Sequence, residues 1–552
     1  MNKKVIKVNA DDNVIVALTD LQKGETVEYN GESFTLQTDV AAKHKFVTGD
    51  LKIGDEIHMY GVLVGKASEP IAKGARITTT NIKHAVSGEF VVNQNDVKWN
   101  APDVSKWKGK EFLGYHRSDG KVGTANYWLV VPLVFCENRN IEILKEAFLK
   151  ELGFAKPNNY QQQVKELVKL KESGASMEEI LNFQFTVEAS TSNQKSAQFP
   201  NIDGIKFLTH EGGCGGIRQD ANVLCSLLAS YITHPNVAGA TVLSLGCQNA
   251  QISILEEEIA KRNPTFDRPL FILDHQQSGS EPRLLTEAIN KTFAGLVKAN
   301  ETKREPAPLT KLTIGVKCGG SDGFSGISAN PAVGYVSDII VGLGGSSVLA
   351  EFPELCGVEQ ELVNRTVKKE DAEFFLQLMK KYAANAAAVG SGFDMNPSPG
   401  NIKDGLITDA MKSAGAAKKG GTSPIVDVLD YPQQVKNPGL SLLCTPGNDV
   451  EAVTGLAAAH SNIVLFTTGL GTPTGNPVAP TIKISSNTKL FNKMHDIIDV
   501  NTGTVIEGDE TIEQAGGRLF DYILKVASGE EIISAVRNGQ DDFIPWKRGV
   551  SL

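Results

Sequence analysis

The hydrophobic positions of residues 1–92 fall into short runs separated by turn signals. The runs include "KVIKV", "NVIVAL", "ESFTLQ" and "EIHMYGVLVG". One pattern occurs three times, in "DLQKGETV" (20–27), "DLKIGDEI" (50–57) and "PIAKGARI" (70–77): an apolar residue, a glycine three positions later and an apolar residue three beyond. Short β-type runs joined by repeated tight turns predict a compact all-β module.

From residue 111 the pattern changes to near-continuous apolar runs that alternate with amphipathic segments. The runs predict strands at 127–135, 205–209, 240–245, 270–273, 312–316, 346–350, 424–429, 440–444, 462–467 and 481–485. Amphipathic spacing predicts helices at 141–152, 219–232, 250–262 and 281–299. Apolar strands with helical crossovers are typical of parallel sheets that are covered on both faces.

These changes predict an α/β protein with a small N-terminal all-β module followed by two parallel-sheet α/β domains. The expected boundaries are 1–92 for the β module, 93–110 for a polar linker, 111–305 for the middle domain and 306–552 for the C-terminal domain. A polar, mostly helical insertion is expected at about 156–200 in the middle domain. A chain of 552 residues is too long for a single core, which fits this division.

The composition is that of an ordinary globular protein, with 41% hydrophobic and 22% charged residues. There are 55 Lys and Arg against 64 Asp and Glu and no basic patch, so nucleic acid and anionic membrane are not expected as partners. The N-terminus lacks a signal-peptide core, and no apolar run approaches membrane-spanning length. Seven scattered cysteines do not suit a disulfide framework, so we expect a cytoplasmic protein with reduced thiols.

Four of the cysteines, Cys136, Cys214, Cys247 and Cys318, stand at or just past the end of an apolar strand. In parallel α/β sheets this edge binds ligands, so the four thiols could converge there, together with His210 and Asp322. No C-x-x-C pair supports a zinc knuckle, whereas distant thiolates suit iron as a single ion or as a cluster. Buried structural cysteines fit the same positions about equally well.

The histidines give weaker signals. His210, in "LTHEGGCGG", stands four residues before Cys214 in a Gly-rich turn and is favoured as functional. His44, in "VAAKHKF", lies in the β module. The histidines at 234, 275, 460 and 495 are expected to be structural. A serine hydrolase is not supported, because no G-x-S-x-G elbow occurs.

The stretch "KCGGSDGFSGISANP" (317–331) follows a predicted strand and precedes a predicted helix. It matches neither the P-loop nor the dinucleotide fingerprint. Similar loops are "NPSPGN" (396–401), "TPGND" (445–449) and "TTGLGTPTGNP" (467–477). Because glycine is costly unless the backbone must approach something closely, these loops predict a ligand site.

These motifs carry a resemblance. "CGGSDGFSGISANPAVG", "NPSPGN", "CTPGNDVEA" and "GLGTPTGNP" with "PTIKISSN" resemble the altronate/galactarate dehydratase family. "DDNVIVALTDLQKGETV", "DVAAKHKF" and "MYGVLVGKA" are similar to the SAF-type β domain of that family. The resemblance runs from about residue 5 to the C-terminus, with 156–200 the least matched segment.

The resemblance implies a hydro-lyase that removes water from a sugar acid and depends on a divalent metal, Fe²⁺ or Mn²⁺. "CTPGNDVEAVTGLA" resembles the altronate branch and "DIIDVNTGTVIEGDETIEQAG" the galactarate branch. The first lies nearer the expected site, so D-altronate, giving 2-dehydro-3-deoxy-D-gluconate, is the first expectation. Galactarate or another sugar acid, a non-catalytic sugar-acid binding relative and an iron–sulfur redox protein are the alternatives. Formation of a homo-oligomer is left open.

The chemistry of this dehydration suggests roles for individual residues. The loop at 317–331 would cradle the acid, with Cys318 or Asp322 facing the metal. His210 would take the α-proton, and His44, carried by the β module as a lid, would protonate the leaving hydroxyl. An iron–sulfur cluster held by three of the four strand-end cysteines is the alternative Lewis acid. The expected substrate-binding residues are Gly319, Gly320, Ser321, Ser325, Asn330, Asn396, Ser398, Asn401 and Thr472.

The chain departs from the family at several positions where a charged residue, a histidine or a phenol is usual. Either the substrate is held differently or the activity has changed. These positions are occupied here by Thr78, Thr80, Ala125, Gln248, Ala410, Leu470 and Thr474.

Overall fold

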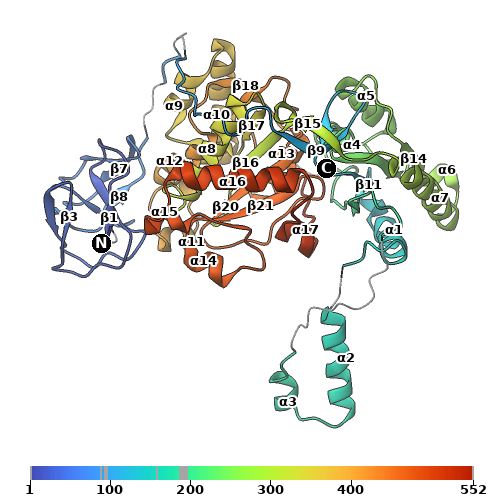
Figure 1. The fold of residues 1–552 in the computed structure, drawn as a ribbon, viewed down its shortest axis with the longest axis horizontal. Helices are drawn as coiled ribbons and strands as arrows, with labels where there is room; N and C mark the ends of the chain where they lie inside the picture. Colours follow the sequence, from blue (N-terminus) through green and yellow to red (C-terminus); the bar gives the residue numbers. More distant parts are fainter. Residues whose placement is uncertain (1–2, 87–89, 93–96, 157–158, 186–196, 550–552) are drawn as a thin grey trace.

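The computed structural model describes residues 3–86, 90–92, 97–156, 159–185 and 197–549. Figure 1 shows an elongated molecule with the N-terminal β domain at one end, the large C-terminal domain in the centre and the middle domain at the other end. This confirms the predicted fold class. The described part of the expected linker, 97–110, contains no helix or strand.

The N-terminal domain consists of short antiparallel strands. They are β1 (Val5–Ile6), β2 (Val14–Ala17), β3 (Thr26–Tyr29), β4 (Glu32–Thr35), β5 (Lys45–Val47), β6 (Glu56–Met59), β7 (Val62–Ala67) and β8 (Ile82–Lys83). The three repeated turns share one conformation, because Gly24, Gly54 and Gly74 all have φ between 81° and 91°. Only glycine adopts this conformation at little cost, which explains the recurring motif.

The middle domain has a four-stranded parallel sheet in the order β12–β11–β13–β14. Its strands are β11 (Tyr127–Pro132), β12 (Gly204–Phe207), β13 (Val237–Ser244) and β14 (Leu270–Asp274). Its helices are η1 (Phe135–Glu137), α1 (Asn138–Glu151), α4 (Arg218–Ile232), α5 (Ile252–Arg262), α6 (His275–Ser278) and α7 (Glu281–Ala299). Every residue of β11 and β13 is buried, as the continuous apolar runs predict.

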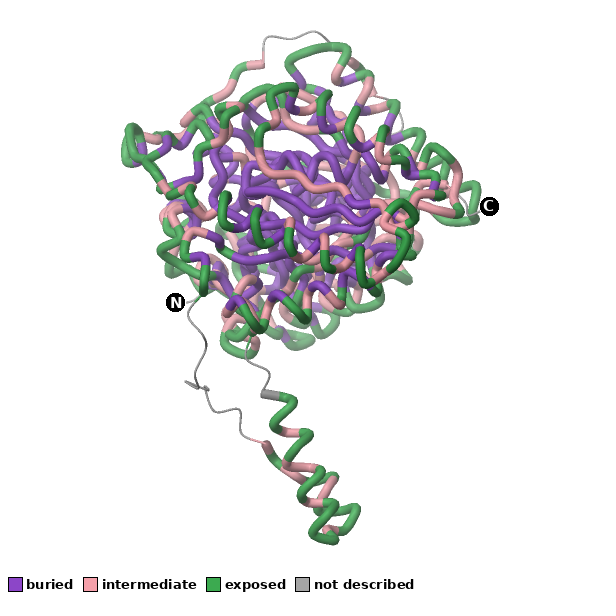
Figure 2. The backbone as a smooth tube through the Cα atoms, turned by 90° about the vertical axis from the view of Figure 1, so that its right-hand side faces the viewer, coloured by how far each residue is buried: buried purple, intermediate pink, exposed green. Residues whose placement is uncertain are grey.

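Two further features belong to this part of the chain. The strands β9 (Glu111–His116), β10 (Val122–Gly123) and β15 (Glu305–Pro308) form a small antiparallel sheet that joins the start and end of the segment. The helices α2 (Asn159–Glu172) and α3 (Met177–Leu181) form the expected helical insertion. They project from the body of the molecule, and none of their residues whose burial the structure describes is buried (Figures 1 and 2). The rest of the expected insertion lies partly outside the described residues.

The C-terminal domain has a seven-stranded parallel sheet in the order β18–β19–β17–β16–β20–β21–β22. The strands are β16 (Thr313–Cys318), β17 (Ser346–Leu349), β18 (Ile425–Leu429), β19 (Gly439–Leu443), β20 (Ile463–Thr468), β21 (Thr481–Ser485) and β22 (Val500–Asn501). The predicted strands of both α/β domains are confirmed. The chain order reverses between β16 and β20, and the crevice at such a point is where parallel sheets bind ligands.

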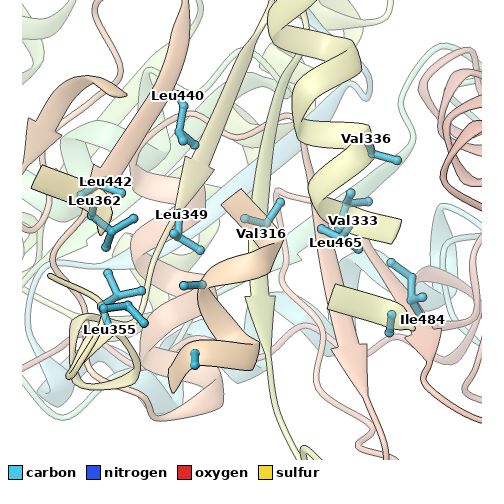
Figure 3. Packing of buried hydrophobic residues seen from close by; sticks show 14 of the residues in the cluster. Val316, Val333, Val336, Leu349, Leu355, Leu362, Leu440, Leu442, Leu465 and Ile484 are labelled. Carbon is cyan, nitrogen blue, oxygen red and sulfur yellow. The ribbon is translucent and has the colours of Figure 1, made fainter. Parts of the chain in front are cut away.

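Helices cover both faces of this sheet. They are α8 (Ala329–Gly342), α9 (Glu359–Arg365), α10 (Lys369–Ala388), α11 (Pro399–Lys403), α12 (Asp409–Ala417), α13 (Asp449–Ala458), α14 (Thr488–Lys493), α15 (Gly503–Glu507), α16 (Ile512–Ala527) and α17 (Ser534–Asn538). Short 3₁₀ turns are η2 (Leu309–Lys311), η3 (Phe352–Leu355), η4 (Phe393–Met395) and η5 (Lys418–Gly420). Figure 3 shows Val316 and Leu465 from the sheet packed beside Val333 and Val336 of α8. No helix in the described ranges is long and apolar enough to cross a membrane.

Two buried histidines join the middle and C-terminal domains. The rings of His234 and His460 meet edge to face at 5.3 Å, and His234 Nε2 contacts the Ser461 carbonyl oxygen at 3.1 Å. His234 Nδ1 accepts a hydrogen bond from the Asn236 N–H at 3.0 Å. Burial lowers the pKa of His234 to about 3. Both histidines are structural, as the sequence predicts.

This burial predicts an acid sensitivity of the folded protein. The unfolded chain protonates His234 below its ordinary pKa while the folded chain does not, so stability is lost as pH falls from about 6.5 towards 3. We expect His234 to account for about 2 kcal/mol of lost stability by pH 5. Urea unfolding of the wild type and of His234→Gln between pH 7.5 and 5 measures this difference. Identical pH dependence of the two proteins would contradict the assignment.

Candidate active site

The Gly-rich loop at 319–326 leaves β16 at the point where the order of the sheet reverses. The neighbouring loop, 469–476, leaves β20 at the same edge. The two are joined by hydrogen bonds from the Gly319 N–H to the Thr467 carbonyl oxygen at 3.0 Å and from the Gly469 N–H to the Gly320 carbonyl oxygen at 2.9 Å. The stretch singled out in the sequence therefore lies at the ligand-binding edge of this sheet.

The N-terminal β domain docks on this edge. We call the contact the seam: residues 43–45, 60–66 and 83–86 of the β domain lie against residues 322–326, 403–410 and 357 of the C-terminal domain. Lys45 Nζ donates to the Gly405 carbonyl oxygen at 2.6 Å, and Thr408 Oγ1 donates to the Val64 carbonyl oxygen at 2.7 Å. The position of the β domain over the strand ends is the one expected of a lid.

Asp322 is the centre of the seam. Its side chain is fully buried, and Oδ1 accepts hydrogen bonds from the Ser325 N–H at 2.9 Å and from the Ser325 and Ser486 hydroxyls at 2.8 Å each. Oδ2 accepts from Asn487 Nδ2 at 3.2 Å and pairs with Lys43 Nζ at 3.1 Å. Asp322 therefore ties the Gly-rich loop to the β domain and has little capacity left for a metal.

Two further residues of the β domain face the seam. Lys45 is buried, and burial lowers its pKa to about 7, against the opposing effect of Asp322. His44 Nε2 lies 3.0 Å from the Lys403 carbonyl oxygen, which only accepts, so this nitrogen carries the proton. His44 Nδ1 is buried without a partner and is left as an acceptor. The sequence predicted His44 at the site and missed Lys45.

Cys318 lies in a different environment from the one expected. Its sulfur is 2.7 Å from Lys419 Nζ and 2.9 Å from Glu354 Oε2. Lys412 Nζ pairs with Glu354 Oε1 at 2.8 Å, and Lys317 Nζ pairs with Glu351 Oε1 at 3.2 Å. Ammonium groups thus already neutralise the carboxylates around Cys318, which does not favour a further cation there.

The predicted substrate-binding residues divide into two groups. Ser321 Oγ and Asn396 Nδ2 are buried polar atoms without a partner. The others form the loops: Ser398 and Asn401 form the capping box of α11, Ser325 caps Asp322, Asn330 bridges Gly415 and Thr467, and Thr472 contacts Thr474. An alanine at Gly319 would collide with Asp449, and Gly320 has φ of 59°. Ser321 and Asn396 are the members of the set that are free to bind a ligand.

A metal-type group lies at the other end of the seam. His84, Cys356 and Asp409 bring one nitrogen, one sulfur and one oxygen within 4.8 Å of one another. Asp409 is fully buried, and its oxygens make no hydrogen bond of regular geometry, although the side chains of Asn396 and Cys356 lie within reach; His84 Nδ1 has no partner. Burial, reinforced by Glu354, raises the pKa of Asp409 to about 8. No sequence signal brought these three residues together, because they lie far apart in the chain.

The other three strand-end cysteines lie in the middle domain, so the expected convergence with Cys318 is wrong. Desolvation, reinforced by the Cys214 and Cys247 thiols, raises the pKa of Cys136, so the three thiols lie close enough to interact. His210 lies on the same loops, yet its ring is occupied: Nε2 contacts the Pro132 carbonyl oxygen at 2.8 Å and Nδ1 accepts from the Gly212 N–H at 3.1 Å. Burial lowers the pKa of His210 to about 4. Neither ring nitrogen is free to take a proton from a substrate.

The departures from the family pattern are scattered. Ala125 lies at the start of β11, away from the strand ends. Gln248 is turned inward and donates to Ser244 Oγ at 2.6 Å. Ala410 and Leu470 lie near the C-terminal ends of the strands of the large sheet, Ala410 beside Gly357 and Leu470 beside Gly320. Two of these four replacements are therefore placed to alter a ligand site on the C-terminal domain.

Comparison with known proteins agrees with this architecture. Family models match along the chain: the altronate/galactarate dehydratase SAF domain at residues 3–85, the second domain of D-galactarate dehydratase/altronate hydrolase at 114–300 and the C-terminal domain of D-galactarate/altronate dehydratase at 309–551. These three domains in this order define a class of multidomain enzymes built on an N-terminal SAF domain. The chain belongs to the altronate/galactarate dehydratase family.

Curated relatives match along nearly their whole length. Altronate dehydratase of Bacillus subtilis (strain 168) is 33% identical over 550 residues, which is 100% of both chains. Altronate dehydratase of Escherichia coli (strain K12) is 33% identical over 551 residues, 99% of both chains. Galactarate dehydratase (L-threo-forming) of the same strain is 29% identical over 531 residues, 95% of this chain and 93% of the relative.

The Lys43–Asp322 pair predicts how firmly the SAF domain is held. Lys43→Met leaves a buried carboxylate without its cation, so we expect a loss of about 3 kcal/mol in unfolding free energy and faster proteolysis between the domains. Lys4→Met is the control, because the Lys4–Glu25 pair is exposed and contributes less than about 1 kcal/mol. Equal effects of the two substitutions in urea unfolding would argue against a buried clamp.

Proposed function

We propose that the protein is a hydro-lyase that dehydrates a sugar acid, with D-altronate as the first substrate and galactarate as the alternative. The full-length likeness to two altronate dehydratases supports the reaction class. One observation supports an active site at the seam: buried polar atoms there and beside it lack hydrogen-bond partners. These atoms belong to His44, His84, Ser321, Asn396 and Asp409. Buried polar groups are normally paired, so an unpaired set indicates a site for a polar ligand.

Three places were expected to hold, or are able to hold, the divalent metal that the family implies. The Cys318 group does not fit, because Lys317, Lys412 and Lys419 already supply its positive charge. The three thiols of the middle domain lie on another sheet. The group of His84, Cys356 and Asp409 fits, because its unpaired donors combine imidazole, thiolate and carboxylate. This donor set suits Fe²⁺ better than Mn²⁺, which prefers oxygen ligands.

When bound, such an ion would stabilise the negative charge that develops on the substrate carboxylate as the α-proton leaves. The remaining work falls to side chains of the seam. Asn396 lies beside Asp409, and its amide is placed to donate to a carboxylate or hydroxyl oxygen of a ligand. Ser321 Oγ and His44 Nδ1 are free to hydrogen-bond hydroxyl groups of a polyol acid.

Lys45 is the proposed general base in place of His210. With a pKa of about 7, a large share of its side chain is the neutral amine at physiological pH, the form that accepts a proton. Lys45, Ser321 and Asp409 are all buried with the SAF domain docked. Substrate therefore reaches them when this domain moves away, and its return excludes water from the reaction.

The first test is anaerobic turnover with Fe²⁺, following formation of the 2-keto-3-deoxy acid from D-altronate and, in parallel, from galactarate. We expect product from altronate and little from galactarate. Product from galactarate alone would reverse the substrate order. Absence of product from both acids, with metal bound, would overturn the proposed activity in favour of a sugar-acid binding protein.

The second test concerns the base. Activity should rise as pH increases through about 7, because Lys45 must be neutral to act. Lys45→Met should lower kcat by about 100- to 10,000-fold and remove this limb of the pH profile. Lys52→Met, an exposed lysine of the same domain, is the matched control and should change neither. A retained limb in Lys45→Met would exclude Lys45 as the base.

The third test concerns the metal. Asp409→Asn and Cys356→Ser should each weaken binding of Co²⁺, because each removes an anionic ligand, and Cys356→Ser should also remove the thiolate charge-transfer absorbance. Cys444→Ser, a buried cysteine outside the group, should leave binding unchanged. If Cys356→Ser and Cys444→Ser bind Co²⁺ equally, the metal lies elsewhere.

A further inference from the structure

The middle domain carries a second strand-end site that the proposed reaction does not use. Cys136, Cys214 and Cys247 follow β11, β12 and β13, which are neighbours in the parallel sheet. The chain order reverses at β11, with β12 on one side and β13 on the other, so the site lies at a topological switch point. Figure 1 shows the middle domain at the opposite end of the molecule from the SAF domain.

The three loops are held together by their backbones. The Phe135 N–H donates to the Gly212 carbonyl oxygen at 3.1 Å, and the Ala250 N–H donates to the Gly213 carbonyl oxygen at 3.0 Å. Asn249 Nδ2 donates to the Cys214 carbonyl oxygen at 2.7 Å. These bonds join the loop of each cysteine to that of another and fix the three thiols on one edge.

A glycine allows the Cys214 loop to lie close to the end of β11. Gly213 has φ of 96°, and a Cβ there would lie 2.3 Å from the Leu133 carbonyl oxygen. Any other residue would push the Cys214 loop away from the end of β11. The close crossing of the two loops is therefore built into the sequence immediately before Cys214.

A contact between Glu137 and His275 supports the Cys136 loop. Glu137, the next residue, is fully buried, accepts a hydrogen bond from Asn140 Nδ2 at 2.7 Å and contacts His275 Nδ1 at 2.8 Å. His275 follows β14, the fourth strand of the sheet. All four strand ends thus contribute a side chain to one group of neighbouring residues, although only three contribute a thiol.

The thiols themselves are accessible and free. Cys136 and Cys247 are exposed, Cys214 is partly exposed, and none forms a disulfide. This differs from Cys225, Cys318, Cys356 and Cys444, which are buried. Three of the seven cysteines therefore have access to solvent, and these are the three that lie together.

The spacing of the thiols distinguishes a cluster from a lone ion. A single ion with metal–sulfur bonds of about 2.3 Å requires sulfurs within about 4 Å of one another. The three sulfurs do not all lie within 4.8 Å of one another. A cluster spreads its thiolates over separate irons and so suits a wider triangle.

We propose that Cys136, Cys214 and Cys247 bind an iron–sulfur cluster of the four-iron class, with one iron left without a protein thiolate. Because Cys136 and Cys247 are exposed, water or a small oxygen ligand would have access to the iron that lacks a thiolate. This site is independent of the seam and of the proposed dehydration there. The chain is therefore a two-site metalloprotein, with a lone ion at one end and a cluster at the other.

The test is the iron and acid-labile sulfide content of anaerobically purified full-length protein, together with its visible absorbance before and after dithionite. We expect about four irons and four sulfides per chain and a broad absorbance that bleaches on reduction. Cys136→Ser, Cys214→Ser and Cys247→Ser should each lower both contents severalfold. Cys225→Ser is the control, because this cysteine is buried in the same domain and should leave the cluster in place.

Other outcomes would overturn the proposal. Iron without sulfide would indicate a lone ion, and sulfide that survives all three substitutions would place the cluster elsewhere. Asp409→Asn separates this proposal from the proposed function, since it should abolish turnover and leave the sulfide content unchanged. Loss of the cluster in Asp409→Asn would show that the two sites are not independent.

Discussion

The carboxylate of Asp322 is the interaction on which the architecture of the seam depends. A fully buried charge is tolerated only when it is neutralised and hydrogen-bonded, and here the partners come from three separate parts of the chain. Ser325 fixes the Gly-rich loop, Ser486 and Asn487 fix the loop after β21, and Lys43 brings the SAF domain. One side chain thus sets both the shape of the strand-end loop and the position of the domain above it.

The electrostatics of the seam follow from this arrangement. Lys43 takes the direct contact with Asp322, which leaves Lys45 with a carbonyl oxygen as its hydrogen-bond partner and with a lowered pKa. Two lysines separated by one residue therefore have opposite tasks: one is a permanent cation that closes the domain contact, and the other is held near neutrality. Such divergence between neighbouring ionisable groups is typical of sites that move protons.

The fold was largely predictable from the sequence, because burial on both faces makes parallel strands continuous apolar runs. The SAF domain was predictable from its repeated turns, since the left-handed backbone at Gly24, Gly54 and Gly74 leaves a motif. Strand-end loops were also found, because parallel topology places them at one edge. The sequence does not indicate which of the two sheets carries each loop. Cys318 was therefore grouped with cysteines of the other sheet.

The rest of the candidate site was hidden for physical reasons. The low pKa of Lys45 is a product of burial by another domain, and no local pattern encodes it. His84, Cys356 and Asp409 meet only in three dimensions, and Asp409 is unusual because of the partners that it lacks. For His210 the sequence favoured a function that the structure does not support. A histidine in a Gly-rich turn is typical of an active site, yet here it hydrogen-bonds the backbone of the cysteine loops.

The long sequence separation of the seam has a consequence for synthesis of the protein. The hydrogen bonds of Lys43 and Lys45 to the C-terminal domain span 361 and 360 residues. At about 5–20 residues per second, a nascent SAF domain waits roughly 20 to 70 seconds before its docking surface emerges from the ribosome. Throughout that interval Lys45 lacks its hydrogen-bond partner on Gly405. The environment of Lys45 in the folded protein is therefore completed only on docking, at the last step of assembly.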